Sequence, residues 1–133
     1  MNLSKLHQII SSSIFKSADL GNEDNILDSR DEAPFDSEWV EIYTLISQEY
    51  EQTKPQEDEE AIESIRKSAF FASEQFFGTH EISSYISDDF DLIAKAIVTN
   101  TQDKRITWLL DYYINHGIPH KLIKTHEKSI LDY

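Results

Sequence analysis

Apolar residues in this chain recur every three or four positions, and this spacing constrains the fold more than any other feature. In one segment a single helical stripe holds Trp39, Ile42, Tyr43, Ile46 and Tyr50. No segment shows the strict alternation of apolar and polar residues that is typical of a strand with one buried face. The sequence therefore predicts an all-α fold.

The predicted helices are bounded by capping residues, glycines and prolines. Asp36 or Ser37 can cap one helix, and Gly78 and Gly117 are placed to end two others. The expected helices span residues 2–16, 37–53, 57–77, a short turn at 79–86, 89–99, 102–115 and 119–133. Six or seven helices joined mostly by short links predict an antiparallel bundle or a short helical-hairpin stack. A solenoid is the second choice, because no internal repeat is found.

A chain of 133 residues has the length of one ordinary domain, so we expect a single all-helical domain over residues 1–133. The helical pattern fails at about residues 17–36, which contain many acids and few apolar residues. We expect an acidic loop there, anchored to the body of the protein by Ile26, Leu27 and Phe35.

The negative charge is concentrated in one part of the chain. The net charge is -13, and the stretch from Asp19 to Glu63 holds sixteen acidic residues against Arg30 and Lys54. Such a stretch repels nucleic acid and anionic membranes and attracts a basic partner. The alternative interpretation is a solvated surface that only keeps the protein soluble.

The chain contains no cysteine, which excludes disulfides, a thiolate zinc site and a cysteine nucleophile. The first sixteen residues lack the continuous apolar core of a signal peptide, and no later run is as apolar as a membrane span. We therefore expect a cytoplasmic protein that does not enter a membrane. The sequence does not indicate an oligomeric state.

Catalytic, metal and cofactor motifs are not recognisable. His116 and His120 have the spacing of a metal pair, but Gly117 and Pro119 interrupt the helix between them. Asp88 and Asp89 are interpreted as caps at a helix N-terminus instead of an acid–base pair. With no phosphate-binding loop and no nucleophile motif, we expect no enzymatic activity, no cofactor and no metal.

The acidic run Glu23–Glu41, the acidic cluster Glu57–Glu63 and the nearby tyrosines carry a likeness to a known class of proteins. In size, acidity, helical content and lack of cysteine, the chain resembles bacterial immunity proteins, which neutralise toxins of contact-dependent inhibition or similar secreted toxin systems. The resemblance implies an inhibitor that binds and blocks a basic partner, most simply a nuclease toxin. The partner-binding residues that it implies are Asp24, Asp28, Asp31, Glu32, Asp36, Glu38 and Glu41, with Trp39, Tyr43 or Tyr112 as anchors.

Two other functions remain open on the sequence. A helical adaptor or regulatory module would bind its partner elsewhere, and its interaction would be insensitive to salt. An all-helical enzyme would need histidine or carboxylate side chains from different helices to meet in one pocket. Direct binding of DNA or RNA is disfavoured, because bases outside the acidic stretch are scattered.

Overall fold

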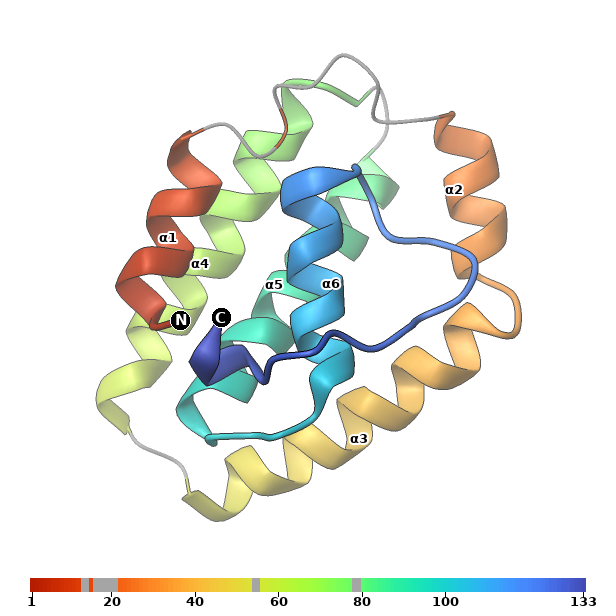
Figure 1. The fold of residues 1–133 in the computed structure, drawn as a ribbon. Helices are drawn as coiled ribbons and strands as arrows, with labels where there is room; N and C mark the ends of the chain where they lie inside the picture. Colours follow the sequence, from red (N-terminus) through yellow and green to blue (C-terminus); the bar gives the residue numbers. More distant parts are fainter. Residues whose placement is uncertain (13–14, 16–21, 54–55, 78–79) are drawn as a thin grey trace.

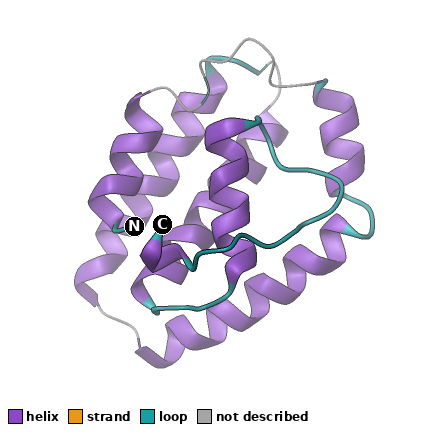
Figure 2. Cartoon of the chain, in the orientation of Figure 1, coloured by secondary structure: helices purple, strands orange, loops and turns teal. Residues whose placement is uncertain are grey.

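The computed structural model describes residues 1–12, 15, 22–53, 56–77 and 80–133. It confirms an all-helical bundle, and none of the described residues forms a strand (Figure 2). The elements are α1 (Leu3–Ser12), α2 (Glu23–Arg30), α3 (Phe35–Thr53), α4 (Gln56–Glu74), α5 (His80–Val98), α6 (Lys104–Asn115) and a short 3₁₀ helix, η1 (Ile130–Asp132).

Helix α5 is the centre of the bundle. It contacts all the other described helices, including η1. Buried side chains cover most of its circumference, and the exposed Ser84 and the half-buried Asp88 and Lys95 lie on its remaining face. Its long contact with α4 and its shorter one with α6 join three helices that run in alternating directions (Figure 1).

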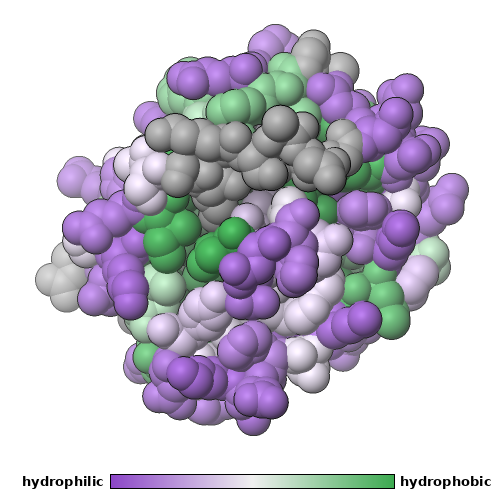
Figure 3. Space-filling model, turned by 45° about the horizontal axis from the view of Figure 1, so that its top comes forward, coloured by the Kyte–Doolittle hydropathy of each residue, from purple (hydrophilic) through white to green (hydrophobic). Residues whose placement is uncertain are grey.

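The remaining helices cover α5 from two sides. Helix α1 lies beside α4, and α3 crosses the lower end of the bundle with α2 above it (Figure 1). The surface turned forward in Figure 3 is mixed, with hydrophobic patches among hydrophilic side chains. None of the helices in the described part of the chain is long and apolar enough to cross a membrane.

The expected acidic loop contains a helix. Helix α2 occupies residues 23–30, and the side chain of Asn22 caps it by accepting a hydrogen bond from the backbone N–H of Asn25 at 3.1 Å. Glu23 and Asp24 lie in the first turn and Arg30 in the last, where the helix dipole favours each charge. Its weak apolar pattern explains why the sequence predicted a loop; residues 17–21 of that loop lie outside the described residues.

The short turn and the helix expected at 79–86 and 89–99 are one continuous helix, α5. Neither a glycine nor a proline lies between His80 and Val98, and the Ser87 hydroxyl donates to the Ser84 carbonyl within the helix. The prediction that Asp88 and Asp89 cap a helix was therefore wrong. The predicted stop at Gly78 lies outside the described residues.

The predicted boundaries around α6 are partly confirmed. Asn100 follows α5 with a left-handed φ of 57°, Asp103 caps α6, and Gly117 follows it with a φ of 128°. The helix expected from Pro119 to the C-terminus was wrong, because only η1 is helical there. Lys121 has a φ of 74°, which an α-helix does not allow. The segment crosses in front of α6 in Figure 1.

Truncating the middle of α5 tests its central position. Leu92→Ala should reduce the free energy of unfolding by about 2–5 kcal/mol, because Leu92 is fully enclosed and a cavity would remain. Leu45→Ala is the matched control on α3, where the side chain is 45% exposed, and should cost about 1 kcal/mol or less. Urea denaturation followed by circular dichroism measures both. Equal losses would contradict the central position of α5.

Candidate functional site

The site is organised around one buried carboxylate, that of Asp89 on α5. Three helices donate hydrogen bonds to it: Arg30 from α2 through Nη1 at 2.8 Å and Nη2 at 2.7 Å, Trp39 from α3 through Nε1 at 2.9 Å, and Tyr113 from α6 through its hydroxyl at 2.5 Å. Asp89 is fully buried. These bonds fix α2, α3 and α6 against α5 at one point.

The Arg30 guanidinium makes further contacts besides its ion pair with Asp89. Its Nη1 donates to the carbonyl of Pro119 at 3.1 Å, and its guanidinium lies over the rings of Phe35 and Tyr85, at 4.6 and 5.3 Å from their centroids. Burial acts to lower the pKa of Arg30, but the charge and hydrogen bonds of Asp89 outweigh it and raise the pKa. Arg30 is therefore a permanently charged anchor for the end of α2.

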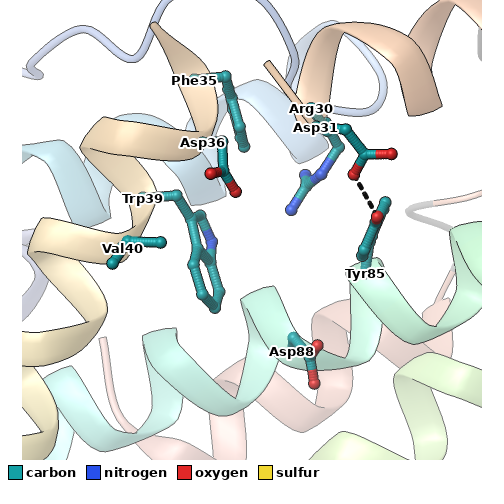
Figure 4. Close-up of a pocket in the computed structure, with 8 residues that line it drawn as sticks. All are labelled: Arg30, Asp31, Phe35, Asp36, Trp39, Val40, Tyr85 and Asp88. Carbon is teal, nitrogen blue, oxygen red and sulfur yellow. Dashed lines mark hydrogen bonds between the residues drawn. The ribbon is translucent and has the colours of Figure 1, made fainter. Parts of the chain in front are cut away.

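A cavity of about 130 Å³ lies next to this network (Figure 4). Its lining comes from the end of α2, the first turns of α3 and one face of α5. The lining residues are Arg30, Asp31, Phe35, Asp36, Trp39, Val40, Tyr85 and Asp88. In Figure 4 the Trp39 and Arg30 side chains face each other across the cavity.

Carboxylates from three segments border the cavity. The Tyr85 hydroxyl donates to Asp31, and this bond, together with burial, raises the pKa of Tyr85 to about 12. Asp88 accepts a hydrogen bond from Arg66 at 3.0 Å. Burial has the largest effect on the pKa of Asp88 and raises it, while the charge of Arg66 acts to lower it. The Asp36 carboxylate has no hydrogen bond or ion pair with another described residue. The cavity thus combines aromatic walls with an acidic border.

The structure brings together four of the predicted partner-binding residues. Asp31, Asp36 and Trp39 line the cavity, and the ring of Tyr43 stacks on Trp39 with centroids 5.2 Å apart and an interplanar angle of 12°. Tyr43 is exposed on the outer side of α3. Their binding role stays a prediction. Helical spacing already placed Trp39 and Tyr43 on one stripe, but the position of Asp31 beside them was not evident from the sequence.

The other predicted residues lie apart from the cavity. Asp24, Asp28 and Glu32 are exposed on α2 and just after it. Tyr112 packs between Trp108 and His116 along α6. None of these residues lines the cavity.

Glu38 and Glu41 face a second charged cluster centred on Arg105 of α6. Arg105 bonds to Glu38 at 2.9 Å, to Glu41 at 3.4 Å and to Asp103 at 2.7 Å. Burial acts to raise the pKa of Asp103, but the hydrogen bonds from Arg105 outweigh it and lower the pKa. These two glutamates therefore join α3 to α6 as well as adding negative charge.

Sequence reasoning missed Asp88, Arg30 and Tyr85 as parts of the site. Asp88 and Asp89 were interpreted as caps, although an acidic pair among the apolar residues spaced from Ile82 to Ile97 is a signal for a buried polar contact. The only arginine in the acidic stretch was the other available signal. Neither signal shows that Arg30 and Asp89 lie close enough to form an ion pair.

No group of three histidine, aspartate or glutamate side chains among the described residues could hold a metal ion. The cavity has no histidine in its lining. His7 Nε2 lies 2.8 Å from the Ser68 hydroxyl, but this contact joins α1 to α4, away from the cavity.

Removing the charge of Asp89 tests the network. Asp89→Asn should reduce the free energy of unfolding by about 3–5 kcal/mol, because the buried Arg30 charge loses its partner. Asp28→Asn changes the charge equally on an exposed side chain and should alter stability by about 0.5 kcal/mol or less. Urea unfolding of both variants is the measurement. A mild effect of Asp89→Asn would show that Arg30 finds another partner.

Tyr113 gives the network a pH dependence. Burial, followed by the charge of Asp89, raises the pKa of Tyr113 well above its ordinary value of 10.0. Above about pH 10, Tyr113 loses its proton in the unfolded chain but keeps it in the folded protein, so the free energy of unfolding falls as the pH rises. In Tyr113→Phe, the fall in unfolding free energy between about pH 9 and pH 11 should be smaller than in wild type. Equal falls in urea titrations at the two pH values would contradict this origin.

Comparison with known proteins adds a finding independent of the geometry. A model of the family described as "Immunity protein PIM1" matches residues 2–120. The matched range covers α1 to α6 and includes Pro119, whose carbonyl accepts from Arg30. No curated protein matches the chain.

Proposed function

Because the chain belongs to the PIM1 family of immunity proteins, we propose that it blocks a nuclease toxin in the cytoplasm through an acidic surface on α2 and α3. The family gives the coarser role, that of an immunity protein that binds a toxin. The nuclease target and the acidic surface are our proposal. The mechanism needs no chemistry, because a bound inhibitor excludes the substrate from the toxin's active site.

The observation that carries the proposal is the position of the acids. Asp24, Asp28, Asp31, Glu32 and Asp36 are exposed within one short part of the chain that runs from α2 into the start of α3. A cleft that binds nucleic acid neutralises its phosphates with lysine and arginine side chains and is therefore positively charged. An acidic surface is complementary in charge to such a cleft, as the negatively charged nucleic acid is.

The charge and the aromatic residues have different parts in binding. Opposite charges over the two surfaces accelerate the encounter, and this effect weakens with salt. Aromatic side chains that become buried in the complex slow its dissociation. Trp39 and the exposed Tyr43, which stack on each other beside the acids, supply that second element.

Two charge variants with the same net change test the surface. In the first, Asp24→Asn, Asp28→Asn and Glu32→Gln remove three exposed acids outside the cavity. In the control, Glu59→Gln, Glu60→Gln and Glu63→Gln remove three exposed acids on α4. Stopped-flow association with the cognate toxin at low salt should be about tenfold slower for the first variant and nearly unchanged for the control.

The toxin's own activity is the second measurement. The toxin should degrade DNA or RNA, and an equimolar amount of the immunity protein should stop the degradation. A cognate toxin without nuclease activity would overturn the nuclease target. Binding that is indifferent to salt and to both variants would overturn the acidic surface and favour a partner-binding face elsewhere.

A further inference from the structure

We propose that the cavity between α2, α3 and α5 receives one lysine or arginine side chain of the toxin. The inference rests on the proposed function and names the contact at its centre. Its support is the combination of a cavity, aromatic walls and carboxylates from three segments, all at one place on the acidic surface.

The size of the cavity suits one long side chain. Its volume of about 130 Å³ leaves room for several water-sized groups. The charged end and last methylene groups of a lysine or arginine fit such a space. The cavity is therefore a socket for a single projecting group.

The electrostatics of the lining favour a cation. The positive charge of Arg30 is matched by the two hydrogen bonds to Asp89. The carboxylates of Asp31, Asp36 and Asp88 then leave the cavity with excess negative charge, of which the ion pair between Arg66 and Asp88 offsets only a part. Asp36 is the strongest candidate partner, because no other described residue pairs with its carboxylate.

The aromatic side chains in the cavity wall are suited to a cation and are already held in position. The Arg30 guanidinium lies over the Tyr85 ring, and the Trp39 ring lines the opposite side of the cavity. Trp39 is fixed by its bond to Asp89 and by its stacking with Tyr43, and Tyr85 by its bond to Asp31. A socket with fixed walls loses little conformational entropy when it is filled.

The surroundings of the opening can pack against the stem of the incoming side chain. Val40, which is 49% exposed, lines the cavity on the outer side of α3, and Tyr43, 40% exposed, lies one turn further along. Exposed apolar groups beside a charged socket match the usual centre of an interface, where aromatic and aliphatic anchors surround a buried polar contact. The larger groove beside Phe71 and Phe76 lacks this charge, and nothing indicates its occupant.

The test compares two substitutions that remove one exposed carboxylate each. Asp36→Asn lies in the cavity, and Asp28→Asn lies outside it. Both reduce the long-range attraction equally, but only Asp36→Asn should increase the dissociation rate of the toxin complex, by about tenfold or more. Thermal denaturation of the two proteins checks that both variants fold as wild type does.

A double-mutant cycle identifies the toxin residue. Each lysine and arginine at the toxin's surface is changed to alanine, and one of these changes should abolish the difference between wild type and Asp36→Asn. In the Trp108→Phe protein, where Trp39 is the remaining tryptophan, that same toxin variant should also lose the change in fluorescence on binding.

The outcomes separate this inference from the proposed function. Equal dissociation rates for Asp36→Asn and Asp28→Asn, or the absence of any coupled cation, would overturn the socket, even if the toxin is a nuclease bound through its charge. A toxin without nuclease activity would overturn the proposed target and leave the socket standing, provided that the coupled cation is found.

Discussion

The carboxylate of Asp89 is fully buried, and three helices donate hydrogen bonds to it. An isolated charge in that position would be very costly, so the fold depends on Arg30, Trp39 and Tyr113 arriving together. Replacing the whole network by apolar residues of the same volume could preserve stability. What the ion pair adds is a defined position: Arg30 reaches its partner only when α2 lies against α5.

That position explains how a short, acidic helix holds its place. Helix α2 has few apolar residues, and Ile26 and Arg30 are its buried ones. A helix of eight residues has little stability of its own. Its single arginine and the buried Ile26 therefore tie the segment to the core, while its aspartates are exposed. The charge that makes the surface attractive to a basic partner is carried on a segment that two buried side chains hold in place.

The helical bundle could be predicted from the sequence because apolar spacing reports directly on which residues are buried. Most helices, including α3, α4 and α6, lie within a few residues of their expected bounds. The failures have a common cause. Asp88 and Asp89 resemble caps when only the local sequence is considered, because spacing does not reveal that Arg30 pairs with Asp89. Leu122, Ile123 and Ile130 have helical spacing, although only Ile130 of the three lies in a helix. In the same way, the list of acids and aromatics contained part of the cavity lining, but only the fold separates Asp36 from Glu38, which is engaged by Arg105.

Trp39 belongs to two environments, since its Nε1 donates to Asp89 while the ring also borders the cavity. Arg30 is shared in the same way, because it is bonded to Asp89 and also lines the cavity, whereas Asp36 and Val40 line the cavity without bonding to Asp89. Substitutions at Asp36 or Val40 change the opening without touching any bond to Asp89. Evolution can therefore adapt such a protein to a changed toxin through substitutions at positions such as Asp36 and Val40, while the buried network that fixes the helices is retained.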